Sequence, residues 1–148
     1  MKRFRFPLER VRRWREEQAD LEEIKLERLF SELSAIQRQH EELLSERTQA
    51  ETILNSGKPI SAEELARLDV FRQHVQARCI SLDQLEREHA AKIAQQRQRV
   101  VEARRQFELL ERLRMKNLMQ WRGASNQEQE ALAAELYLAR RRRPSSLP

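Results

Sequence analysis

The sequence predicts an all-α protein: an antiparallel two-helix coiled-coil hairpin with an overhanging second helix. Charged residues make up 36% of the 148 residues and aromatic residues 5%, with only two glycines and four prolines, a composition typical of long helices. The strongest cluster of helix-breaking residues, NSGKPIS at 55–61, separates two long stretches with a helical repeat. With so little apolar mass, we expect a thin seam between two helices in place of a wide core.

The first helix is expected over about residues 7–54, because neither proline nor glycine occurs between Leu8 and Leu54. From Leu26 onward, apolar and small residues recur at alternating steps of three and four, the heptad repeat of a coiled-coil seam. Nearer the start, the same spacing in a shifted frame predicts a local offset of the supercoil near Ile24. This shifted frame consists of Val11, Trp14, Gln18 and Leu21.

Residues 55–61 are predicted to form the turn. Gly57 can adopt the left-handed conformation that ends a helix, and Pro59 prevents immediate continuation. Ser61 can cap a new helix, and Glu64 three residues later completes a capping box. Because this turn is short, the two helices are expected to fold back antiparallel.

The second helix is predicted over about residues 62–122, with a continuation to 143 left open, before a disordered tail at 144–148. Folding back at residue 58 places Leu8 opposite about residue 108, so that no part of the chain is expected to cover the helix after roughly residue 115. The heptad frame continues through nine heptads without a slip. The first of its two seam positions holds Leu65, Arg72, Cys79, Glu86, Ile93, Val100, Phe107, Arg114 and Trp121. The second holds Leu68, Val75, Leu82, His89, Gln96, Ala103, Leu110, Asn117 and Ala124.

Positive charge gathers toward the two ends of the sequence. Residues 1–15 hold seven basic groups and one acidic group, residues 112–122 hold four basic groups and no acidic one, and RRRR follows at 140–143. Arginine and aromatic side chains are favoured as anchors in protein interfaces, so docking to another protein is the preferred interpretation. A solvated arginine face and a membrane-surface segment are the alternatives. Nucleic-acid binding is less favoured, because acidic residues interrupt the basic stretch and no stacking platform is visible.

No catalytic motif is visible, so neither an enzyme nor a cofactor is expected: the sequence has no phosphate-binding glycine loop and no dinucleotide fingerprint. His40 is expected to face about residue 77 and His89 about residue 28, which gives no metal site. The single cysteine, Cys79, fits a reducing compartment and the role of a small seam residue. No apolar run approaches the roughly 20 residues that span a bilayer, so a soluble, cytoplasmic protein is expected.

The opening stretch, FRFPLERVRRWREEQADLEEIKLERLFSEL, resembles the start of the flagellar FliJ family, a small coiled-coil component of the flagellar type III export apparatus. That family begins with Phe-x-Phe-x-Leu and a valine or leucine three residues later. Phe4, Phe6, Leu8 and Val11 match these positions. The chain length, two long helices, one corner past residue 55 and a basic tail also resemble the family layout.

The resemblance implies a non-enzymatic stalk at the cytoplasmic face of the inner membrane. Its partners would be the hexameric export ATPase, an export gate membrane protein and substrate-specific chaperones. Residues expected to contact the export gate are Phe71 and Val75, matched within VFRQHV, together with Leu82. Residues expected to contact the ATPase ring, as the open end enters it, are Phe4, Phe6, Arg10, Arg13, Trp14, Trp121, Arg140 and Arg141.

Three alternatives remain open at this point. The stalk proteins of virulence type III secretion share the same architecture. A nucleic-acid-associated hairpin would bind duplexes with an affinity that falls steeply with salt. A generic scaffold would pair its second-helix overhang with a second copy of itself.

Overall fold

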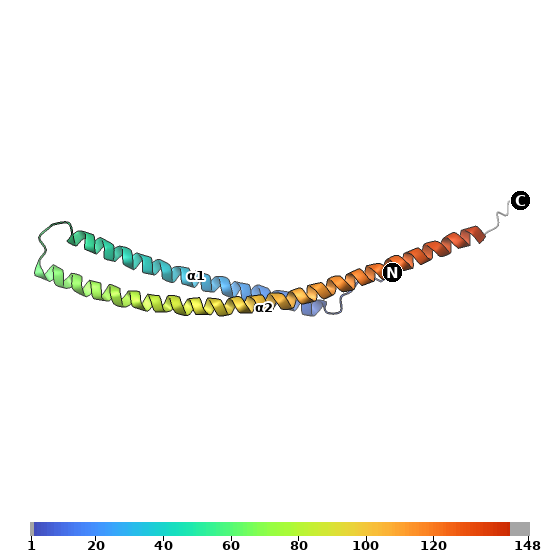
Figure 1. The fold of residues 1–148 in the computed structure, drawn as a ribbon, viewed down its shortest axis with the longest axis horizontal. Coiled ribbons are helices and arrows are strands. Elements are labelled where there is room, and N and C mark those ends of the chain that lie inside the picture. Colours follow the sequence, from blue (N-terminus) through green and yellow to red (C-terminus); the bar gives the residue numbers. More distant parts are fainter. Residues whose placement is uncertain (1, 143–148) are drawn as a thin grey trace. The chain divides into compact units, whose positions relative to one another are not determined.

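The computed structural model describes residues 2–142, and two α-helices account for most of them (Figure 1). Helix α1 spans Glu9–Leu54 (46 residues), and helix α2 spans Ala62–Arg142 (81 residues). Neither helix contains a stretch long and apolar enough to cross a membrane. No strand occurs among the described residues, which confirms the all-α prediction. The predicted tail at 144–148 lies outside the described residues.

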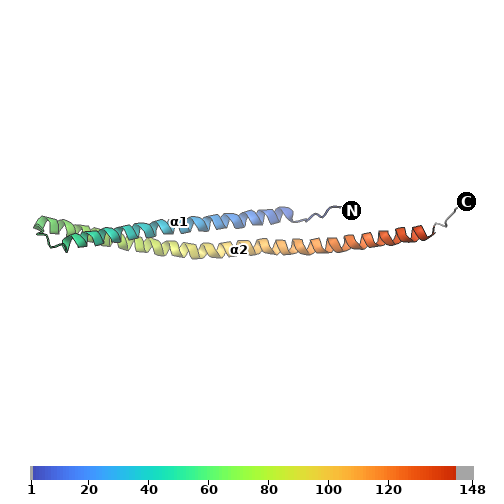
Figure 2. The ribbon, with the colours of Figure 1, turned by 90° about the horizontal axis from the view of Figure 1, so that it is seen from above.

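The chain divides into two packed units. The hairpin unit is Asp20–Glu102, and the terminal unit combines Met1–Ala19 with Ala103–Pro148. In the hairpin unit, α1 and α2 run antiparallel and lie side by side in both ribbon views (Figures 1 and 2). In the terminal unit, a non-helical segment and the first turns of α1 lie along α2. We call residues 2–8 the N-terminal segment.

Helix α1 begins at Glu9, two residues later than about residue 7. Proline biases the preceding residue toward an extended backbone, so Pro7 keeps Phe6 out of the helix. The chain turns through Pro7 and Leu8, and the Glu9 N–H donates to the Phe6 carbonyl oxygen at 3.2 Å. The segment before the helix is therefore non-helical.

The corner between the helices has the predicted chemistry. Gly57 adopts a left-handed φ of 75°, a conformation that costs glycine little. Ser61 and Glu64 form the capping box: the Glu64 N–H donates to Ser61 Oγ at 3.2 Å, and the Ser61 N–H donates to the Glu64 carboxylate at 3.3 Å. Local sequence signals thus determine where α1 ends and α2 begins.

Burial along α2 of the hairpin unit follows the predicted heptad frame. Val75 and Leu82 are each only 1% exposed. Near the corner the seam is more open, since Leu65 is 51% exposed. The apolar core of this unit is therefore a single line of side chains. The most buried positions of α2 in this unit are Val75, Leu82, Ile93, Gln96 and Val100.

The predicted offset near Ile24 is wrong. Val11, Trp14 and Leu21 are 43%, 48% and 49% exposed. The heptad frame of the later part of α1 continues toward its N-terminus without a slip, at steps of three and four. It passes through positions with polar or small side chains, which the apolar pattern does not reveal. These positions are Glu22, Ala19, Arg15 and Arg12, all less exposed than the three apolar residues.

The register of the two arms differs from the predicted one. His40 Nδ1 lies 3.1 Å from the Glu86 carboxylate, although residue 77 was expected opposite it. His89 Nε2 lies 3.2 Å from the Glu32 carboxylate, although residue 28 was expected. The reason is the non-helical corner at 55–61, whose residues do not advance along the arms with the helical rise. Each residue of α1 therefore meets a residue several positions later in α2 than simple counting gives.

We predict that Leu82→Ala lowers the free energy of unfolding by about 2–5 kcal/mol, because it leaves a cavity in a one-residue-wide core. Urea denaturation followed by circular dichroism measures this loss. Ile80→Ala is the matched control, since Ile80 lies two residues away and is 62% exposed. Equal losses in the two variants would contradict the burial of the α2 seam.

Candidate protein-binding site

The N-terminal segment is held against α2 by its two phenylalanines. Phe6 is 7% exposed, and the Phe4 ring lies 6.0 Å from the Trp121 ring, centroid to centroid, at an interplanar angle of 54°. The structure thus brings together three predicted site residues. Since Phe6 is buried and Phe4 and Trp121 are half-buried, their main role is to anchor the segment within the chain.

The expectation that α2 is uncovered after residue 115 is wrong for the residues up to Ser125, but residues 126–142 are all exposed. An extended chain advances about 3.3 Å per residue, against 1.5 Å for a helix. Because Arg12 already faces Glu111, the register of the two arms accounts for most of the difference, and the non-helical N-terminal segment adds a few residues of reach. Lys2 lies with Trp121, Ala124 and Ser125 around a shallow depression, and Ser125 is 9% exposed.

Arg12 is the centre of a polar network that joins the start of α1 to α2. Its guanidinium donates to the Glu9 carboxylate at 2.8 Å and to Glu111, and it lies 5.9 Å from the centroid of the Phe107 ring. The hydrogen bond from Arg12 lowers the pKa of Glu9, and the charges of Arg12 and Arg114 lower it further. The same hydrogen bond raises the pKa of Arg12. This network occupies the part of the terminal unit between the buried side chains of Phe6 and Ala19.

A second set of side chains on α1 points to solvent. Arg10 is exposed, and the Arg13 side chain is 71% exposed with one contact to Glu9 at 3.4 Å. Trp14 is 48% exposed, and the Arg15 guanidinium lies 4.7 Å from the centroid of its ring. Arg15 also donates to Gln106 on α2, which holds this cation over the ring. An exposed tryptophan among arginines is the composition expected of a protein-binding surface.

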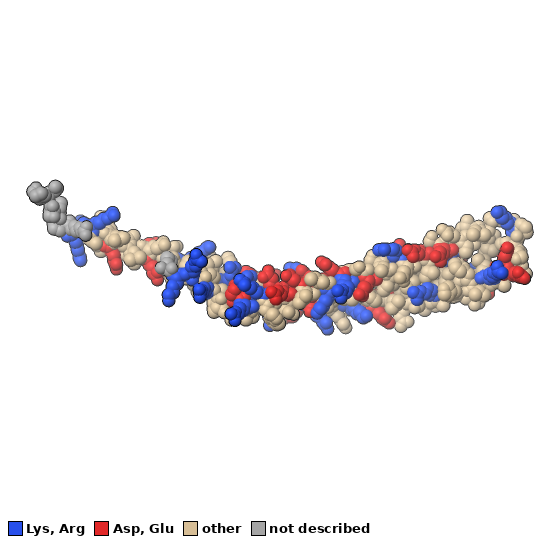
Figure 3. All heavy atoms as spheres, turned by 180° about the vertical axis from the view of Figure 1, so that it is seen from behind, with Lys and Arg blue, Asp and Glu red and all other residues tan. Residues whose placement is uncertain are grey.

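The terminal unit carries most of the positive charge of the chain. Its residues include seventeen basic and eight acidic side chains, whereas residues 20–102 include twelve basic and sixteen acidic ones. On the face drawn in Figure 3, lysine and arginine gather over the N-terminal segment and at the end of α2. Lys2, Arg3 and Arg5 are exposed and line one shallow depression. The terminal unit therefore has an exposed basic surface.

Arg140 and Arg141 lie in the last turn of α2 and are exposed. From Trp121 to Arg140, α2 rises about 28 Å at 1.5 Å per residue. The structure therefore does not bring these two arginines together with Phe4, Phe6 and Trp121. Arg143, the last residue of the RRRR run, lies outside the described residues.

Two of the three predicted export-gate residues are unavailable to a partner. Val75 and Leu82 are fully buried in the seam of the hairpin unit, so their inclusion in a binding surface is wrong. The heptad frame that places them on one face of α2 also directs that face at α1. Phe71 flanks the seam and is half-buried, so its ring remains partly accessible.

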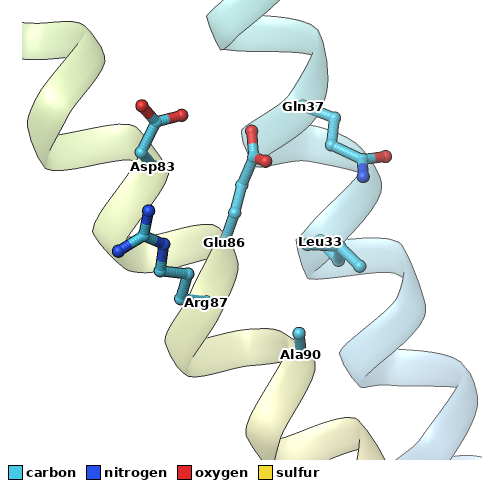
Figure 4. A pocket seen from close by; sticks show the side chains of 6 residues that line it. All are labelled: Leu33, Gln37, Asp83, Glu86, Arg87 and Ala90. Carbon is cyan, nitrogen blue, oxygen red and sulfur yellow. The ribbon is translucent and has the colours of Figure 1, made fainter.

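The structure adds a cross-arm cluster that the sequence did not indicate. His40 Nδ1 lies 3.1 Å from a carboxylate oxygen of Glu86 and 3.5 Å from one of Asp83. This nitrogen and the two oxygens all lie within 4.8 Å of one another. Figure 4 shows the two carboxylates on α2, beside a shallow groove that Leu33 and Gln37 of α1 also line. Pairing of the imidazole with the two carboxylates accounts for this arrangement. Sequence reasoning missed it because the expected register placed His40 opposite residue 77.

We predict that Arg12→Gln raises the pKa of Glu9 toward its ordinary value of 4.5, because the largest cause of its lowering is removed. With a lowered folded-state pKa, Glu9 stabilises the fold above pH 4.5, and this contribution is lost as the pH falls through the lowered value. NMR titration of the Glu9 carboxyl group measures the change. Arg10→Gln is the control and should leave the pKa of Glu9 as it is. An unchanged Glu9 titration in Arg12→Gln would refute the network.

Comparison of the chain with protein-family models, with curated proteins and with solved structures gives no match.

Proposed function

We propose that the chain is a non-enzymatic stalk component of a flagellar type III export apparatus. In this proposal its terminal unit binds the hexameric export ATPase, and the protein works at the cytoplasmic face of the inner membrane. The observation that carries the proposal is an exposed basic and aromatic surface on a preordered scaffold: Arg10, Arg13 and Trp14 point to solvent, while the N-terminal segment is fixed to α2.

Preordering favours binding because little conformational entropy is lost when the partner arrives. Phe4 and Phe6 keep the N-terminal segment in place, and the Arg12 network holds the first turn of α1 on α2. A partner therefore meets an assembled surface. The basic residues of this surface are exposed arginines. Each ion pair between one of them and a partner contributes about 1 kcal/mol or less to the binding free energy. Many weak contacts suit a stalk that shifts between the subunits of a ring.

The resemblance to the FliJ family supports the identity of the partner. The motif residues Phe4 and Phe6 have a structural reason to be there, since they anchor the segment that carries Lys2, Arg3 and Arg5. Contact with the export gate is proposed through Phe71 alone among the three matched residues. Escort of export chaperones belongs to the same proposal, with no surface assigned to it.

The basic excess of the terminal unit also favours a second candidate, binding to nucleic acid. Phosphate contacts would make the affinity for duplex DNA or RNA fall steeply with salt. The acidic residues Glu9, Glu16 and Glu17 interrupt this surface on α1, which weakens this candidate relative to a protein partner. A stalk of virulence type III secretion stays within the first proposal, with the ATPase of that system as partner.

We predict that the full chain binds the cognate export ATPase and changes its rate of ATP hydrolysis. The double charge reversal Arg10→Glu with Arg13→Glu should weaken binding by about tenfold or more, because two attractive contacts become repulsive. Pull-down and ATP turnover assays measure the two effects.

The matched control reverses two exposed arginines of the hairpin unit, Arg67→Glu with Arg72→Glu. It changes the net charge by the same amount and should leave binding close to that of the unaltered chain. Absence of binding by the unaltered chain would contradict the proposal. So would equal loss in both double variants, which would indicate nonspecific charge attraction.

A further inference from the structure

The last part of α2 presents apolar side chains to solvent. We call residues 126–142 the overhang; every one of them is exposed. Leu132, Leu136 and Leu138 are 59%, 65% and 52% exposed. A helix of this length gains most of its stability from packing rather than from its own hydrogen bonds. The overhang therefore needs a covering surface that the described part of the chain does not provide.

The uncovered face continues a face of α2 that is already an interface. The N-terminal segment lies against Trp121 and Ser125, and Leu118 beside them is half-buried. Steps of seven, eleven and eighteen residues return to the same side of an α-helix. From Leu118, Trp121 and Ser125, such steps reach Leu132 and Leu136. The stripe of Leu132 and Leu136 is thus the same face of α2, beyond the end of the segment that covers it.

The distribution of charge along the overhang indicates what covers the stripe of Leu132 and Leu136. Its first part carries Glu128, Glu130 and Glu135 without a basic residue, and its end carries Arg140–Arg142 without an acidic one. Two copies in antiparallel orientation place Glu128 of each near the arginines of the other. They also oppose the two helix macrodipoles favourably. A parallel pair would set the three arginines of one copy beside those of the other.

We propose that the overhang pairs with the overhang of a second copy of this chain, as an antiparallel two-helix seam with a two-fold axis near residue 134. Leu132 of each copy then packs against Leu136 of the other, and Glu128 lies near the Arg140–Arg142 turn. Glu135 lies beside its own symmetry mate. The contact is isologous and closes on itself, so it gives a dimer and no longer assembly.

The seventeen residues of the overhang give a seam about 26 Å long. Such a contact falls at the small end of specific interfaces, so the dimer is weak and concentration-dependent. A weak pairing leaves the same stripe accessible at low concentration. The dimer is independent of the proposed function, since no ATPase takes part in it.

Sedimentation velocity of the full chain across a concentration series tests the pairing. We expect a shift from monomer to dimer and no larger species. Leu136→Gln should weaken this association by at least about tenfold, because the leucine is buried twice in a symmetric contact. Leu138→Gln is the matched control: Leu138 lies about 160° away around the helix from Leu136 and should have little effect. A monomer at all concentrations, or equal effects of the two variants, would overturn the proposal.

Disulfide crosslinking in a Cys79→Ser background tests the orientation. Glu135→Cys places its thiol next to the two-fold axis, so oxidation should join two chains. Glu128→Cys places its thiols far apart in the antiparallel pair and close together in a parallel one. Crosslinking of Glu135→Cys with little crosslinking of Glu128→Cys supports the proposal. Efficient crosslinking of Glu128→Cys, or failure of both variants to crosslink, would overturn it.

Discussion

The antiparallel seam between α1 and α2 is the constraint on which the rest of the structure depends. A two-helix hairpin has a core one side chain wide, so each seam position must be filled either by an apolar residue or by a polar residue with a partner. Val75 and Leu82 are apolar seam residues. Gln96 is a polar seam residue with a partner, since its amide donates to the Glu22 carbonyl oxygen at 3.0 Å. The Gln96 amide also donates to the Glu22 carboxylate, and this second hydrogen bond, followed by the one from Lys25, lowers the pKa of Glu22.

The terminal unit shows what happens when this constraint meets a strongly basic sequence. Arg12 occupies a seam position, where its side chain contacts the Phe107 ring and its charge meets Glu9 and Glu111. An apolar seam would have buried apolar residues such as Trp14. Here Trp14 stays exposed on the surface. A polar seam therefore leaves an aromatic side chain available for binding. The polar seam around Arg12 thus both stabilises this unit and decides which side chains lie on its surface.

Much of the fold could be predicted from the sequence, because its signals are local. Gly57 marks the corner, Ser61 and Glu64 cap α2, and the regular apolar heptads of α2 give the correct inward face at Val75 and Leu82. Periodicity fails where the seam is polar. An arginine at position 12 looks like a surface residue until its partners on the other helix are known, so the apolar residues around it suggest a false frame.

The candidate site was predicted less well, since it depends on distances between segments that are remote in sequence. Counting helical residues from the corner placed Leu8 near residue 108 and left Trp121 uncovered. The shifted register, which pairs Arg12 with Glu111, and the non-helical segment before Pro7 together bring Phe4 to Trp121. The same counting hid the approach of His40 to Glu86. The residue types of the binding surface were recognisable from the sequence, but their division into buried anchors and exposed contacts was not.

The central claim is that packing is uneven along α2: a covered helix up to Ser125, followed by an uncovered overhang. Amide hydrogen exchange at low protein concentration, resolved along the chain, tests it most directly. The account predicts slow exchange across the seam residues around Val75 to Val100, measurable protection to about Ser125, and fast exchange in residues 126–142. Equally slow exchange along the whole of α2, or fast exchange at Trp121 and Ser125, would contradict it.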